Sequence, residues 1–319
     1  MAAKREQPTF DVATLAASGF PIISFDALTV GETFRSDERT IRPHDVDAYA
    51  FAVEDHDPWF FEPGPFGGPI VHPTLLANQA LFLRNERYFV PAGLHARMQL
   101  AFERPVLLGS RARTTGEVAE KYVRRGKPYM VTKFETRDET NLLTRGQLVQ
   151  MLFQGETAPA HGSGPKPDVE PEALDPDITD TAGRAGPLEI GQALDSLTRT
   201  LSQRQIDAYS GVRPGSIHTD ESWARAKGFP TTIAQGMMST AYVSTLMTAA
   251  FGRGFVEGGR MDVRFLRPTF RGDTITIRGN LRGVSRDGDR VFVDVSAQNQ
   301  NGADTMAGTA SARVPRTGD

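Results

Sequence analysis

The sequence predicts an α+β protein built from two tandem copies of one unit, in which an antiparallel sheet wraps a central helix. Three observations predict it. The chain repeats itself at a nearly constant spacing, each copy contains one strongly apolar helical segment, and segments of strand-like composition follow that helix. With 319 residues the chain is long enough for two domains of ordinary size, each with its own core.

The repeat consists of matching segments in the two halves. Asp47-Ala48-Tyr49 matches Asp207-Ala208-Tyr209 at a spacing of 160 residues, and Phe102–Pro105 matches Phe265–Pro268 at a spacing of 163 residues. The second copy therefore carries three extra residues between its tyrosine and Ile233. This insertion lies in the loop that precedes the apolar helix.

A segment rich in proline and glycine, residues 155–186, separates the copies, and this composition predicts an extended linker. The predicted domains are thus an N-terminal one at residues 25–154 and a C-terminal one at residues 187–315.

Each copy has the same predicted order of elements. A short strand, a short helix, an irregular loop and an apolar helix come first, and strands close the copy. The short helices are expected at 43–53 and 202–209, the apolar helices at 74–83 and 233–247, and two closing strands at 274–278 and 290–296. The second apolar helix has apolar side chains on most of its faces, which predicts that other structure encloses it.

Composition excludes several classes of function. A net charge of -3 argues against nucleic-acid binding, and the absence of cysteine excludes disulfides, thiolate nucleophiles and Cys-based metal sites. The first ten residues lead into no apolar signal region, and the longest apolar stretch, 237–251, is too short to cross a bilayer. We therefore expect a cytoplasmic protein with no membrane or nucleic-acid partner.

Three segments of the second copy carry a resemblance to a known family. They are Ser216–Asp220 (SIHTD), Gly228–Met237 (GFPTTIAQGM), and Arg264–Pro268 (RFLRP) with Gly272-Asp273 following. In this order they resemble the hydratase motif, the start of the central helix and a strand turn of the MaoC-like acyl-CoA hydratase/dehydratase family. The resemblance implies a double hot-dog fold, with one hot-dog domain per copy.

The resemblance also implies a function, which is hydration of a trans-2-enoyl-CoA or dehydration of a 3-hydroxyacyl-CoA by a lyase. His218 would be the acid/base, and backbone N–H groups at 234–236 would polarise the thioester oxygen. The substrate-binding residues expected on this basis are Asp220, Ala234, Gln235, Gly236 and Arg264. The partner is an acyl-CoA thioester, and neither a separate cofactor nor a metal is expected.

The catalytic carboxylate of the family motif is replaced in the second copy. Arg213 stands at that position, so it could instead bind a carboxylate or phosphate of an unusual acyl-CoA. A carboxylate, Asp55, occurs at the matching place in the first copy, but Phe60 stands where that copy's histidine belongs. Asp55 joins His218 and Arg213 as a catalytic candidate, against the alternative of a polar turn, and His72 is expected to pack or cap a helix.

Two other functions stay open at this point. The same scaffold could hydrolyse an acyl-CoA with a carboxylate-activated water, or the chain could be a non-catalytic acyl-CoA-binding or partner subunit. The sequence also leaves open whether the protein forms a homodimer.

Overall fold

The computed structural model describes residues 19–80, 82–90, 93–152 and 189–314. The predicted linker at 155–186 lies outside these ranges. The first copy contains β1 (Thr33–Arg35), β2 (Arg39–Thr40), α2 (Pro43–Val53), the 3-10 turn η1 (Pro58–Phe60), α3 (Leu75–Ala80), the 3-10 turn η2 (Leu83–Glu86), β3 (Gly93–Phe102), β4 (Arg111–Arg124), β5 (Lys127–Arg137) and β6 (Leu142–Leu152). The second contains β7 (Leu197–Thr200), α4 (Gln203–Ser210), α5 (Glu221–Ala226), α6 (Gly236–Phe251), α7 (Arg253–Val256), β8 (Arg260–Phe265), β9 (Thr274–Val284), β10 (Arg290–Gln298) and β11 (Asp304–Arg313).

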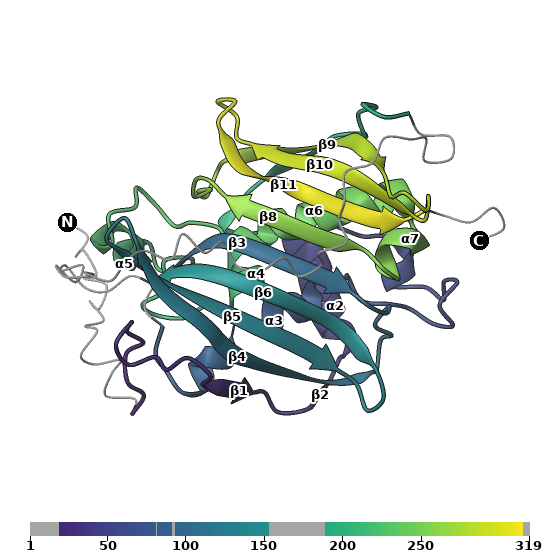
Figure 1. Cartoon of the computed structure of the whole chain (residues 1–319). Helices are drawn as coiled ribbons and strands as arrows, with labels where there is room; N and C mark the ends of the chain where they lie inside the picture. The colour runs from purple at the N-terminus through teal and green to yellow at the C-terminus, as the bar shows by residue number, and fades with distance from the viewer. Residues whose placement is uncertain (1–18, 81, 91–92, 153–188, 315–319) are drawn as a thin grey trace, which may run out of the picture.

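A single antiparallel sheet runs through both copies (Figure 1). Its order is β1-β4-β5-β6-β3-β8-β11-β10-β9-β7, with β2 paired to β4. Read from the edge of the sheet toward its middle, the first copy has the order β1-β4-β5-β6-β3. The second copy has the equivalent order β7-β9-β10-β11-β8, which confirms the duplication. The copies join where β3 pairs with β8, from Arg97 opposite Arg264 to Ala101 opposite Arg260.

In the view of Figure 1, α2, α3, α4 and α6 lie behind the sheet and form a second layer against it. The short helices agree with the prediction, because α2 spans Pro43–Val53 and α4 begins directly after its N-cap, Ser202. The helix α6 is 16 residues long, and its first and last turns both contribute buried side chains. Each half therefore wraps its strands round helical segments, which is the double hot-dog architecture.

The apolar helices differ from their predicted bounds. The second begins at Gly236 rather than 233, because Ile233 bridges to Phe270 and the Ala234 N–H donates to the Thr269 carbonyl. The first copy's helix, expected at 74–83, is only six residues long in α3 and is followed by the turn η2. As a result, the residues from Leu83 onward form the turn η2 and not a continuation of the helix.

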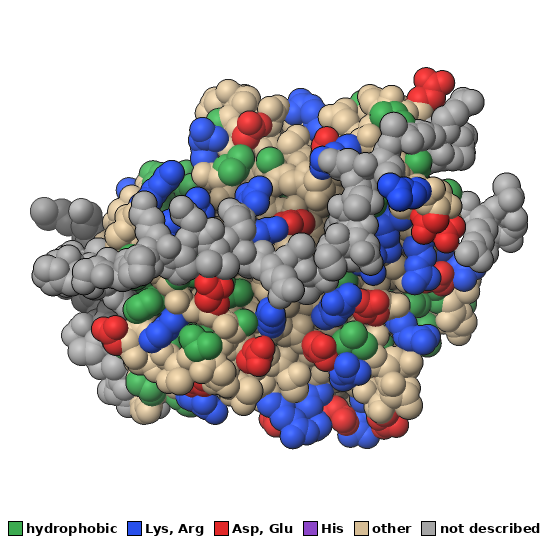
Figure 2. Space-filling model, in the orientation of Figure 1, with side chains coloured by type: hydrophobic (Ala, Val, Ile, Leu, Met, Phe, Trp, Pro, Cys, Tyr) green, Lys and Arg blue, Asp and Glu red, His purple; other side chains and the backbone are tan. Residues whose placement is uncertain are grey.

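The other face of the sheet carries charged side chains of both signs, interspersed over the part visible in Figure 2. Along β8 the alternation is clear, since Met261 and Val263 are buried while Arg264 is exposed. In the described part of the chain, no helix has the length and apolar character needed to span a membrane.

Candidate active site

His218 lies in the loop between α4 and α5, where its backbone carbonyl accepts a hydrogen bond from Gln203 Nε2 at 3.0 Å. Its backbone N–H donates to Ser216 Oγ at 3.2 Å, and its ring Nδ1 lies 2.8 Å from the Ile233 carbonyl oxygen. A carbonyl can only accept, so Nδ1 carries the proton and Nε2 has a free lone pair. The structure thus presents His218 as a neutral imidazole with one basic nitrogen.

Burial lowers the pKa of His218 to about 4, and the charge of Arg213 lowers it as well, while the hydrogen bond to Ile233 acts in the opposite direction. The ring is therefore unprotonated at neutral pH. In this state it can take a proton from a bound water but cannot give one until it has done so.

A second histidine, His95, faces the same space from the first copy. It lies on β3, its ring is 5.6 Å from that of Phe265, and burial together with the charge of His218 lowers its pKa to about 3. Its Nδ1 is buried and has no hydrogen-bond partner among the described residues. Sequence reasoning missed this residue, because His95 belongs to no motif and to the other copy.

Two pockets meet at these imidazoles, and both are also lined by Gly93. The first, which we call the helix-start pocket, has a volume of about 110 Å³, and its lining includes His95, His218, Ala234, Gly236, Phe265 and Arg267. The second, which we call the arginine pocket, has a volume of about 50 Å³, and its lining includes Phe82, Arg84, Gln150, Arg213, His218 and Gln235. The site is therefore built by both copies.

The start of α6 forms one wall of the helix-start pocket. The first N–H groups of a helix have no partner within it, and the helix dipole favours negative charge there. Gly236 allows a close approach, since a Cβ at this position would lie 2.8 Å from the Phe265 ring and 3.1 Å from His95 Nδ1. An oxygen that develops negative charge would be stabilised at this place.

Arg213 lines the arginine pocket beside His218, in the position where the family motif has its acid. Its backbone N–H donates to Thr219 Oγ1 at 3.2 Å, and the same hydroxyl donates to the Arg213 carbonyl at 3.1 Å. These bonds fix the loop that carries the guanidinium. The structure thus brings Arg213 and His218 together.

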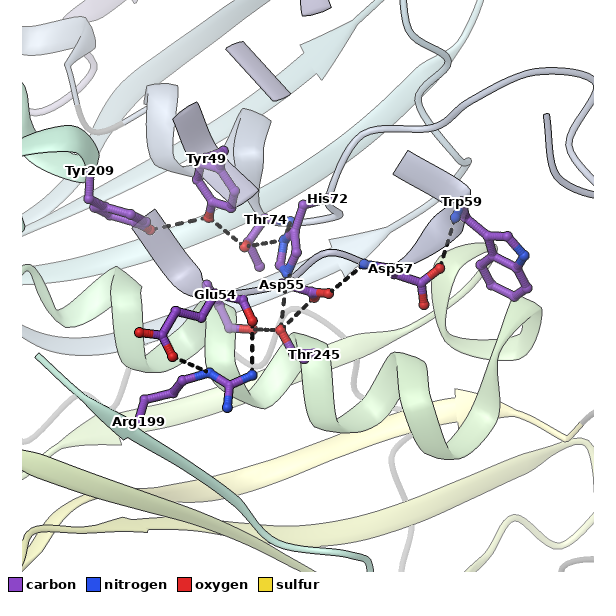
Figure 3. Close-up of polar contacts among 11 residues, drawn as sticks. Tyr49, Glu54, Asp55, Asp57, Trp59, His72, Thr74, Arg199, Tyr209 and Thr245 are labelled. Carbon is purple, nitrogen blue, oxygen red and sulfur yellow. Dashed lines mark hydrogen bonds and ion pairs between the residues drawn. The ribbon is translucent and has the colours of Figure 1, made fainter. Parts of the chain in front are cut away.

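Asp55 lies elsewhere and lines neither pocket. It is only 7% exposed, its Oδ2 is 3.3 Å from His72 Nε2, and the Thr245 hydroxyl of α6 donates to it at 2.7 Å (Figure 3). Burial raises the pKa of Asp55, but the hydrogen bonds and charge of His72 and the bond from Thr245 bring it below its ordinary value. Asp55 is thus a buried carboxylate that contacts His72 of the first copy and Thr245 of the second.

His72 has the packing and capping role expected of it. Its Nδ1 accepts from the Thr74 backbone N–H at 3.2 Å, next to the start of α3, and its Nε2 faces Asp55. Phe60, at the motif histidine's position, is buried with its ring 5.5 Å from that of His72. Aromatic packing therefore occupies the place where the first copy would need its acid/base.

The structure places some of the expected substrate-binding residues at the two pockets and others away from them. Ala234 and Gly236 line the helix-start pocket, and Gln235 lines the arginine pocket with its Oε1 buried and unpartnered among the described residues. Asp220 instead caps α5, accepting from the Trp223 N–H at 3.0 Å, and lines neither pocket. Arg264 points to the exposed face of β8, whereas Arg267 reaches the helix-start pocket.

Comparison with known proteins finds similarities to the second copy. A family model described as the MaoC like domain matches residues 187–302. Over 92 residues, or 28% of this chain, the sequence is 29% identical to an (R)-specific enoyl-CoA hydratase from Rhodospirillum rubrum. The matched segment spans 63% of that enzyme, which is less than two thirds of its length.

Solved structures resemble the chain over nearly its whole length. A MaoC-like dehydratase superposes with a TM-score of 0.72 at 18% identity, covering 92% of this chain and 100% of that one. A Mycobacterium tuberculosis protein described as having a double hotdog fold superposes with a TM-score of 0.64 at 18% identity, covering 93% of this chain and 99% of that one. The second copy is therefore similar to the MaoC like domain over residues 187–302, and the whole chain shares the double hot-dog fold of these solved structures.

Proposed function

We propose that this protein adds water to a trans-2-enoyl-CoA, or removes it from a 3-hydroxyacyl-CoA, at His218. The observation that carries the proposal is the hydrogen bond from His218 Nδ1 to the Ile233 carbonyl, which leaves a basic Nε2 beside the start of α6. The match of the second copy to the MaoC-like domain and to an (R)-specific enoyl-CoA hydratase supports the reaction class.

In the hydration direction, a water molecule between His218 and the substrate gives a proton to Nε2. The hydroxide forms a bond to the β-carbon, and the electron pair of the double bond moves through the α-carbon toward the thioester oxygen. N–H groups at the start of α6 stabilise the resulting oxyanion.

The α-carbon then takes a proton, and the imidazolium at His218 supplies it. One imidazole thus serves first as base and then as acid, and the enzyme returns to its neutral state. The reverse sequence dehydrates a 3-hydroxyacyl-CoA. His95 acts beside it as a second neutral imidazole that keeps the pocket wall polar without adding charge.

Thioester hydrolysis is less well supported by the site. That reaction, on this scaffold, would use a carboxylate to activate water. Among the described residues that line the two pockets there is no Asp or Glu, and Asp55 is bound by His72 and Thr245. The geometry therefore favours addition to the alkene.

The test is incubation of the purified protein with crotonyl-CoA and with trans-2-enoyl-CoA esters of other short acyl groups. We expect loss of the enone absorbance without release of free thiol, and a loss of activity of at least about a hundredfold in His218→Gln. His44→Gln is the matched control, because the His44 side chain is 71% exposed on α2. Release of free thiol would establish a thioesterase instead. If no ester reacts, the remaining interpretation is a non-catalytic acyl-CoA-binding or partner subunit.

A further inference from the structure

We infer that the acyl group of the substrate ends in a carboxylate, and that Arg84 and Arg213 bind it in the arginine pocket. This inference rests on the proposed function, because it uses the place of the thioester to orient the ligand. It names the class of substrate, which is a short dicarboxylic acid joined to coenzyme A through one carboxyl group.

The orientation follows from the way the two pockets meet. The thioester oxygen belongs in the helix-start pocket, where the first turn of α6 can stabilise negative charge. The reacting carbons then lie at His218, which lines both pockets. An acyl chain that continues past His218 enters the arginine pocket.

Arg84 and Arg213 both differ in residue type from the residue expected at their positions. Arg213 occupies the place of the motif's acid, and Arg84 lies 163 residues before Met247, a fully buried methionine of α6. Because α3 ends early, the turn η2 carries Arg84 inward, where it is only 4% exposed and donates to Gln150 Oε1. A buried arginine costs stability unless an anion or another acceptor compensates for its burial.

The charges in the pocket also favour an anion. Burial lowers the pKa of Arg84 to about 10, so the guanidinium stays positive at neutral pH, and burial lowers the pKa of Arg213 in the same direction. His95 and His218 are neutral, and the described lining residues include no carboxylate. These residues therefore contribute two positive charges and no negative one.

The size of the pocket fits a carboxylate. A volume of about 50 Å³ holds roughly three or four water-sized groups, which matches one carboxylate with its carbon. A phosphate of coenzyme A is the alternative occupant, and the binding measurement below distinguishes the two.

The experiment compares two substrates of equal chain length, the CoA monothioester of trans-2-pentenedioic acid and trans-2-pentenoyl-CoA. Two charge-assisted hydrogen bonds predict that kcat/KM is about a hundredfold higher for the dicarboxylic ester. Arg213→Gln should remove most of this preference, so that the ratio of kcat/KM for the two esters falls toward one. Arg225→Gln, an exposed arginine of α5, is the matched control and should change neither rate.

A binding measurement separates this inference from the proposed reaction. By calorimetry, the saturated glutaryl-CoA should bind about a hundredfold more tightly than valeryl-CoA, and Arg213→Gln or Arg84→Met should abolish the difference. Equal affinities for the two saturated esters would overturn the inference even if enoyl-CoA hydration is observed. Equal weakening of both esters and of free CoA by Arg213→Gln would also overturn it, since the arginine would then bind a phosphate of coenzyme A. A retained preference for glutaryl-CoA without hydration of any enoyl ester would instead refute the reaction and keep the anion site.

Discussion

Tyr49 of α2 and Tyr209 of α4, which are equivalent residues of the two copies, meet with their hydroxyl oxygens 3.3 Å apart. A spacing of 160 residues in the sequence thus becomes a direct contact between the two copies. Tyr49 also bonds Thr74 Oγ1 at 2.7 Å, and Thr74 bonds His72 Nδ1 at 2.9 Å, so the chain of hydrogen bonds continues to Asp55. This chain of hydrogen bonds links the two copies at Tyr209 and, through Asp55, at Thr245.

This arrangement predicts that Asp55 serves stability and not catalysis. Asp55→Ala leaves the His72 and Thr245 donors buried without their acceptor, and we expect a loss of about 2–3 kcal/mol in the free energy of unfolding. Urea denaturation measures it, with the exposed Asp47→Ala on α2 as control. A fall of tenfold or more in kcat/KM in a variant that is still fully folded would contradict this assignment.

The pH dependence of activity follows from the low pKa of His218. The reacting form is the neutral imidazole, whose pKa burial lowers from 6.5 to about 4. The kcat/KM for hydration should therefore stay constant from pH 8 down to about pH 5 and fall only as the pH approaches 4. A pH–rate profile of the free enzyme measures this, and an acid limb centred near 6.5 would show that the ring is accessible to water.

The stability should depend on pH for the same reason. His95 and His218 have folded-state pKa values of about 3 and about 4, below the 6.5 of an unfolded histidine. Between these values the unfolded chain binds more protons, so the contribution is complete above pH 6.5 and is lost as the pH falls toward 4. The loss is about 1.4 kcal/mol per pH unit for each histidine.

Urea denaturation between pH 7 and pH 5 measures this slope. The two histidines together contribute a part of this slope, and His95→Gln and His218→Gln should each remove about half of that part. The exposed His44→Gln should leave it unchanged. An unaltered slope in both buried-site variants would mean that other groups cause the acid sensitivity.

Gly236 is predicted to be required for the geometry of the helix-start pocket. In Gly236→Ala the new methyl group would lie 2.8 Å from the Phe265 ring and 3.1 Å from His95 Nδ1, so both rings must move away from the start of α6. We expect kcat to fall at least about tenfold, because the displaced rings change the geometry of the pocket. Alanine itself suits a helix, so the helix should not be destabilised. Adding Phe265→Leu should relieve the contact and recover part of the rate, whereas a lack of recovery would point to the N–H groups themselves.

The sequence by itself determined the duplication, the order of elements and the place of His218, because these depend on local patterns. Apolar periodicity, strand alternation and the spacing of the second-copy motif all act within one copy. Even the orientation of Arg264 followed from alternation, since it must face opposite to Phe265, which lines the pocket. Alternation therefore places the Arg264 side chain on the face away from the helix-start pocket, although the resemblance implies a substrate-binding role for it.

Only the tertiary structure decided which residues share the site. His95 and Arg84 come from the first copy and reach His218 because β3 pairs with β8 and because α3 ends early. Asp55, in turn, is bound by Thr245 from a helix 190 residues away. Such contacts depend on how two separate units pack, and no short segment of the chain encodes that packing.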